Sequence, residues 1–139
     1  MEDRYLFKAK FDDSDRWVKG WLVKINDNYF IIPGYASKIS AFCFSASNII
    51  ELKKDTICQC TGLKDKNGKL IWENDIMVAH LDDAYPENEN YIRILWYESG
   101  LCSKEKGSKD ISPIDKFDQE HFEVCGNIFD NPELLESEG

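Results

Sequence analysis

The chain has 139 residues, of which 42% are hydrophobic and 13% aromatic, and its formal net charge is −9. This composition supplies enough apolar material for a buried core, which excludes an intrinsically disordered chain. The acidic balance disfavours nonspecific binding to a phosphate backbone. No apolar run approaches the roughly 20 residues that cross a bilayer, so we expect no membrane partner.

Alternation of apolar and polar residues, interrupted by turn residues, predicts about ten short strands. They cover residues 5–11, 17–25, 29–32, 41–44, 48–52, 56–61, 70–72, 76–81, 91–97 and 121–129. Two polar stretches, residues 82–90 and 103–110, predict long loops. No stretch predicts a helix long enough to organise the fold.

Two cap-then-proline pairs predict short helical turns. Ser112 precedes Pro113, and Asn131 precedes Pro132. A helix as short as the terminal one is unstable by itself, so we expect it to dock on the β core through the two leucines that follow, Leu134 and Leu135.

These elements predict an all-β fold of short antiparallel strands in two small lobes, with the character of a sandwich or an SH3-like barrel. The predicted lobes are residues 1–57 and residues 58–139, and we expect them to share one core. The second lobe contains a hairpin at Asn67 and Gly68, because this dipeptide tolerates the positive φ that a tight turn needs. We predict a positive φ at Gly68.

Four blocks of the sequence resemble the YopX family of phage and prophage proteins, whose biochemical role is undefined. The blocks, in the family's order and spacing, are residues 7–10 with 17–22, residues 58–68, residues 72–76 and residues 122–135. The resemblance implies a two-lobed β fold and a phage or prophage origin, and it carries no catalytic residues. Asn74 stands where the family usually has glycine, which suggests a corner of positive φ that asparagine also tolerates. The turn and corner residues singled out are Gly62, Asn67, Gly68, Asn74, Gly126 and Pro132.

The cysteines predict free thiols in a reducing cytoplasm, that of the bacterial host, since their number is odd and the N-terminus lacks the pattern of a signal peptide. They are Cys43, Cys58, Cys60, Cys102 and Cys125. Cys58 and Cys60 could offer two metal ligands, but a zinc site usually needs two more at recognisable spacing. His80 and His121 are isolated from them, so we expect two core cysteines and no metal or cofactor.

No catalytic arrangement stands out. His121 and Cys125 are four residues apart, too far along a strand for the hydrogen bond of a nucleophile and its base. The carboxylate pairs Glu73 with Asp75 and Asp82 with Asp83 lie in polar turns. Residues 61–64 lack the pattern of a phosphate-binding loop. We therefore expect that the protein is not an enzyme.

One aromatic group could stack nucleic-acid bases, although core packing is the commoner role. Its members are Trp17, Trp21, Tyr29, Phe30, Tyr35, Phe42 and Phe44. The first hypothesis is a non-enzymatic phage or prophage accessory protein that binds a host or phage macromolecule, most readily a protein. The alternative is a nucleic-acid-binding module on a small β barrel. An uncharacterised enzyme and a homo-oligomer stay open.

Overall fold

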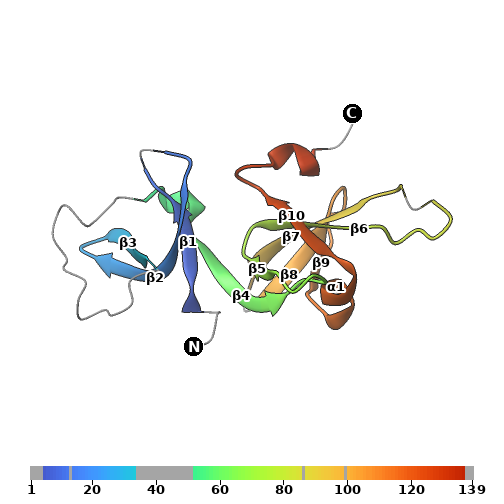
Figure 1. The fold of residues 1–139 in the computed structure, drawn as a ribbon, viewed down its shortest axis with the longest axis horizontal. Coiled ribbons are helices and arrows are strands. Elements are labelled where there is room, and N and C mark those ends of the chain that lie inside the picture. The colour runs from blue at the N-terminus through green and yellow to red at the C-terminus, as the bar shows by residue number, and fades with distance from the viewer. Residues whose placement is uncertain (1–4, 13, 34–51, 86, 99, 137–139) are drawn as a thin grey trace. The chain divides into compact units, whose positions relative to one another are not determined.

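The computed structural model describes residues 5–12, 14–33, 52–85, 87–98 and 100–136 (Figure 1). Within them, two five-stranded antiparallel sheets dominate, and the predicted all-β class is confirmed. The described strands leave both sheets open and close no barrel. The chain forms two compact units, Met1–Cys60 and Thr61–Gly139. No described helix has the length and apolar character of a membrane span.

The first sheet has the strand order β3-β2-β1-β4-β5. Its strands are β1 (Phe7–Lys10), β2 (Trp17–Ile25), β3 (Asn28–Pro33), β4 (Cys58–Lys64) and β5 (Leu70–Trp72), and the boundary between the two units falls within β4. The β2–β3 hairpin turns through Asn26 and Asp27, whose φ values are 48° and 68°. Two consecutive left-handed residues match the right-handed twist of the strands that they join.

The core of the first unit lies on one face of β1 and β2. Ala9 and Val18 are buried there, and Phe7, Phe11 and Leu22 pack against them. Successive residues of a strand project to opposite faces. Trp17 and Trp21 of β2 therefore project to the face opposite this core.

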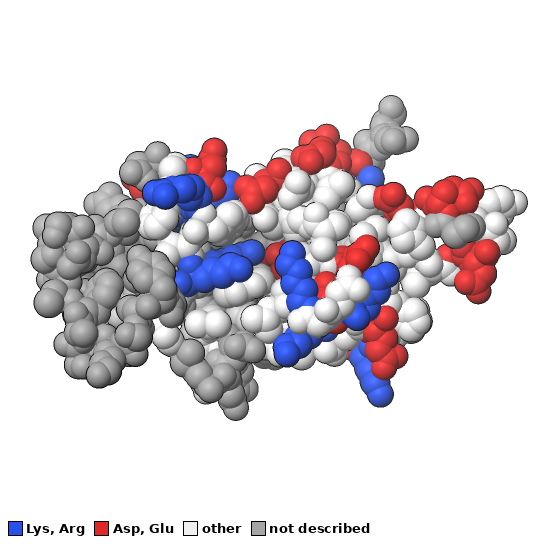
Figure 2. Space-filling view, viewed as in Figure 1, with Lys and Arg blue, Asp and Glu red and all other residues white. Residues whose placement is uncertain are grey.

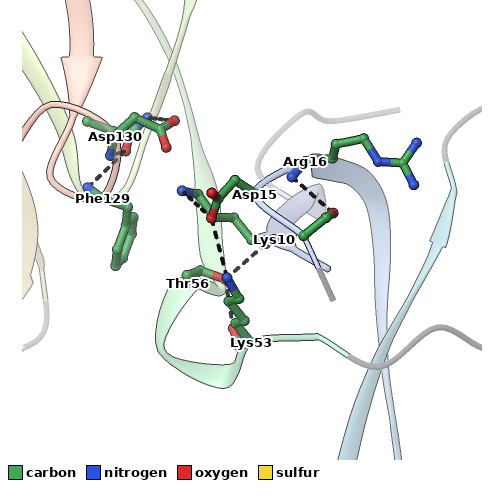
Figure 3. A network of polar contacts seen from close by, with 9 residues as sticks. Lys10, Asp15, Arg16, Lys53, Thr56, Phe129 and Asp130 are labelled. Atoms are coloured by element: carbon green, nitrogen blue, oxygen red, sulfur yellow. Dashed lines mark hydrogen bonds and ion pairs between the residues drawn. The ribbon is translucent and has the colours of Figure 1, made fainter. Parts of the chain in front are cut away.

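Figure 3 shows how the turn η3 (Lys54–Thr56) is fixed to β1. The Thr56 hydroxyl accepts a hydrogen bond from the Lys10 backbone N–H at 2.9 Å and donates one to the Lys53 carbonyl at 2.7 Å. Asp15 Oδ1 lies 3.7 Å from Lys10 Nζ and 3.4 Å from Lys53 Nζ. The Asp15 side chain is exposed, so these ion pairs contribute little and the backbone contacts of Thr56 dominate.

The second sheet has the strand order β10-β6-β7-β8-β9. Its strands are β6 (Asp75–Ala79), β7 (Asn90–Tyr97), β8 (Gly100–Glu105), β9 (Ile111–Pro113) and β10 (Glu123–Asn127). One face of this sheet packs on the core of the second unit. The buried members of that core are Ile71, Met77, Ala79, Ile92, Ile94 and Phe122.

Two predictions for residues 103–115 are wrong. Strand β8 extends to Glu105 into the predicted loop, because Arg93 and Ile92 of β7 offer it a partner. Ser112 and Pro113 belong to strand β9 rather than to a helical turn. The helix α1 (Lys116–His121) begins instead after Asp115, so the last strand starts two residues later than predicted.

The closing segment forms a helical turn where one was predicted, but without the predicted asparagine cap. It is the 3₁₀ turn η4 (Pro132–Leu135) with Pro132 at its start, but the Asn131 side chain does not cap it. Asn131 Oδ1 instead accepts a hydrogen bond from the Asn127 N–H at 3.3 Å. Leu134 and Leu135 are half-buried. The predicted strand 41–44 and most of 48–52 lie outside the described residues, and Leu52 forms a bridge with Phe11.

Candidate functional site

The second unit contains a pocket of about 400 Å³ between α1 and strands β7, β8 and β9, called the α1 pocket below. Its apolar residues are Leu81, Ile92, Pro113, Phe117 and Phe122. Its polar residues are Asn90, Ser103, Glu105, Ser108, Asp110, Ser112, Asp115 and Asp118. Four of these are acidic and none is lysine or arginine, so the pocket carries negative charge.

The register of β7 and β8 explains the floor of the α1 pocket. Ile92 pairs with Glu105 and Ile94 with Ser103, which places these four residues on the core face of the second sheet. Ile92 is 5% exposed and forms the apolar floor of the α1 pocket. Leu81 and Phe117, at 40% and 49% exposure, form an apolar rim instead.

The helix α1 fixes two of the carboxylates. Asp115 Oδ1 accepts the Asp118 N–H at 3.0 Å, and Asp118 Oδ2 accepts the Asp115 N–H at 3.2 Å, which is a reciprocal capping box. Partial burial raises the pKa of Asp118, and the nearby charge of Asp115 adds to the rise, while the Asp115 backbone hydrogen bond opposes it. A cation in the pocket would relieve this repulsion.

The residues considered for nucleophilic catalysis are not arranged for it. Cys125 Sγ donates to the Ile76 carbonyl at 3.4 Å, and the His121 ring stacks on Phe117 with Nδ1 2.9 Å from the Phe117 carbonyl. Neighbouring protein atoms exclude water from part of Cys125 and raise the pKa of its thiol, and nearby carboxylates raise it further. A raised pKa is the opposite of what activates a cysteine nucleophile.

The carboxylates considered for catalysis have structural contacts. Asp75 is 2% exposed, and its Oδ2 accepts the Trp72 N–H at 2.7 Å. Asp82 Oδ1 accepts the N–H groups of Ala84 and Tyr85 in the exposed loop after β6. Within the described part of the chain, no group of three or more histidine, cysteine or acidic residues could hold a metal ion. Cys58, Cys60, Cys102 and Cys125 are free thiols, and Cys43 lies outside the described residues.

Positive φ values occur at three of the singled-out turn and corner residues. The predicted positive φ is confirmed at Gly68, with a value of 82°, and at Asn74, with 70°. Gly62 has a φ of 78° but lies inside β4 rather than at a turn. Asn67 is not among the residues of positive φ, so only Gly68 takes the left-handed conformation in this hairpin.

The remaining turn residues act through close contacts. A Cβ on Gly126 would lie 2.4 Å from Asn131 Oδ1, so only glycine lets the closing segment approach β10. Asn67 donates its backbone N–H to Asp65 Oδ1 and its side-chain amide to Glu123 Oε2, both at 2.8 Å. These residues hold the fold together and do not form a shared binding site.

The YopX protein family matches residues 7–136, nearly the whole chain. The chain belongs to the YopX family. The crystal structure of protein EF1440 from Enterococcus faecalis is similar to this YopX protein at 25% sequence identity, with a TM-score of 0.53. The similarity covers 94% of this chain and 96% of that chain. A comparison with curated proteins finds no match.

The α1 pocket of this YopX protein was not predicted from the sequence. Its acidic residues come from β8, the following loop and α1, and only the folded sheet brings them to Ile92 and Leu81. A signal was present in Asp115 and Asp118, whose spacing is that of a capping box. This spacing predicts a helix that begins after Asp115 and has an acidic N-terminal end.

Proposed function

We propose that this YopX family protein is a non-enzymatic accessory protein of a phage or prophage. In this proposal it acts in the cytoplasm of a bacterial host by binding another protein. The resemblance that motivates a phage origin extends over the matched residues 7–136, and a structurally similar protein comes from a bacterium, Enterococcus faecalis. The hydrogen-bonded carboxylates and the weakly acidic Cys125 thiol support a binding role over a catalytic one.

The α1 pocket is the observation that carries the proposal. It combines an apolar floor and rim with four carboxylates and no basic residue. A lysine or arginine side chain suits such a pocket, because its aliphatic stem can cover Phe117 and Ile92 while its charged head meets the carboxylates. The partner is therefore a protein that presents a basic side chain.

A titration with N-acetyl-arginine amide tests this proposal on the ¹⁵N-labelled full chain. We expect saturable NMR shifts in α1 and β8, and their loss in the double variant Glu105→Gln with Asp110→Asn. Both of these residues are exposed and line the pocket. Unchanged shifts in that variant would contradict the proposal. The matched control is Asp83→Asn with Glu87→Gln, two exposed acids outside the pocket.

A nucleic-acid-binding role is the second candidate. Arg93, Lys104 and Lys106 line a separate pocket on the second unit and supply the positive charge that such a role needs. The net charge of −9 and the open sheets favour it less than a protein partner. A gel shift with single- and double-stranded nucleic acid at several salt concentrations separates the two. Salt-sensitive binding there would favour the second candidate.

A further inference from the structure

The second sheet carries a pocket of opposite charge on its other face. Arg93 and Lys104 line this pocket of about 200 Å³ together with Lys106, Gly107 and Leu135, and we call it the basic pocket. Arg93 follows Ile92 in β7, and successive residues of a strand project to opposite faces. The α1 pocket and the basic pocket therefore lie on opposite faces of the same strands. Glu105 and Ser108 contribute to both.

The two neighbouring positive charges of Arg93 and Lys104 in the basic pocket do not stabilise the sheet. Arg93 and Lys104 are direct partners in the β7–β8 ladder. Like charges in directly opposite positions destabilise a sheet. Positions at which a chain breaks a local rule of stability are often functional.

One carboxylate, that of Glu105, also lines the basic pocket, but no ion pair joins it to Arg93, Lys104 or Lys106 among the described residues. The ion pairs among them involve Lys10, Lys24, Lys53 and Lys116. Lys106 Nζ lies 5.5 Å from the centroid of the Tyr91 ring. A hydrogen bond to Glu89 raises the pKa of Tyr91 to about 12, which keeps this phenol neutral beside the lysine.

The Arg93 guanidinium is held by one hydrogen bond and has one buried N–H donor without an acceptor. Its Nη2 donates to Asn74 Oδ1 at 3.1 Å. Its Nε is buried, and among the buried side-chain nitrogen and oxygen atoms of the described residues it is the one without a hydrogen-bond partner. A buried donor without an acceptor is destabilising, most of all when it is charged, and an anion bound beside it would satisfy it.

We infer that the basic pocket binds a phosphate monoester. The three cations and the Glu105 carboxylate leave the basic pocket with two net positive charges, which a phosphate dianion balances. Its oxygens suit both the fork of a guanidinium and the point charges of lysines. Leu135 supplies an apolar wall for the group that the phosphate esterifies. At physiological ionic strength, screening over about 8 Å lets these local cations outweigh the distant acidic residues. Phosphate binding here does not require a ligand in the α1 pocket, although Glu105 and Ser108 line both pockets.

NMR titration of the ¹⁵N-labelled full chain tests the inference, with phosphoserine as the probe and ionic strength held constant with sodium chloride. We expect saturable shifts of the amides of residues 104–108 and of Arg93, and none with unphosphorylated serine. Lys104→Met should weaken binding by about tenfold or more, since it removes one full charge next to the ligand. Lys104 is exposed, so this variant should fold.

The matched control is Lys69→Met, which removes an exposed lysine from the β4–β5 turn and should leave the affinity unchanged. Equal weakening by both variants, or shifts that never saturate, would overturn the inference. A second arm compares phosphoserine with a short peptide that carries phosphoserine beside leucine. Tighter binding of the peptide identifies the source as a phosphorylated protein, and equal binding identifies it as a small phosphate ester.

Discussion

At the scale of single residues, Asn74 connects the corner of the second unit to its charged face. Its backbone N–H donates to the Ile94 carbonyl at 2.8 Å, and its own carbonyl accepts from Ile128 at 3.0 Å. Its side chain meanwhile orients Arg93. Glycine could form the corner but could not hold the guanidinium. Asparagine combines tolerance of positive φ with a hydrogen-bond acceptor.

Asn74→Gly should therefore keep the corner and lose the contact to Arg93. We expect a loss of roughly 1.5–3 kcal/mol in the free energy of unfolding, the scale of a hydrogen bond to a charged group. Asn74→Ala loses the same contact and also strains a residue whose φ is 70°, so it should cost more. Urea denaturation measures both. Equal stability of Asn74→Ala and the unmodified chain would refute this role.

Asp118 makes the stability of the fold depend on pH. Its pKa is raised in the folded chain, so the fold favours the protonated form. This contribution is fully present below the ordinary carboxyl pKa of 3.8 and is lost as pH rises through the folded value. Asp118→Asn keeps an acceptor oxygen without the charge. It should melt higher than the unmodified chain at pH 7, and the difference should vanish at low pH. A lower melting temperature at pH 7 would contradict this expectation.

At the scale of elements, strands with strong alternation were predicted best. Strand β2 has the predicted bounds, because its pattern depends on residues that are neighbours in sequence. Strands β8 and β9 were missed or misread, since pairing with β7 decides their conformation. Asp115 was missed as a helix cap because Ser112 and Pro113 offered a competing start. Both pockets depend on such nonlocal pairing, which local patterns do not reveal.

The turn η4 gives a prediction at this scale. Leu135 lies beside Arg93 and Lys104, so η4 packs on the face of the second sheet that carries the basic pocket. Because Leu134 and Leu135 are half-buried, replacing both with alanine should cost roughly 1–3 kcal/mol in the free energy of unfolding, less than a fully buried pair. Thermal melting and light scattering measure the loss and any aggregation. An unchanged melting temperature and solubility would mean that η4 does not stabilise the sheet.

At the scale of the whole molecule, charge is distributed unevenly. Figure 2 shows acidic side chains gathered at the right-hand end, where Figure 1 places the loop after β6. The net charge of −9 favours encounters with basic partners, and the rate of such encounters should fall as salt concentration rises. The two pockets then differ in what they select, since one suits a basic side chain and the other a phosphate.

The most direct test of the proposed protein-binding role is affinity capture from a bacterial host lysate with three forms of the full chain. These are the unmodified protein, the α1 pocket variant Glu105→Gln with Asp110→Asn, and the matched control Asp83→Asn with Glu87→Gln. We predict that a protein is captured by the unmodified chain and the control, is lost from the pocket variant, and is released by N-acetyl-arginine amide. Recovery of the same protein with the pocket variant, or recovery of nucleic acid in its place, would contradict the account.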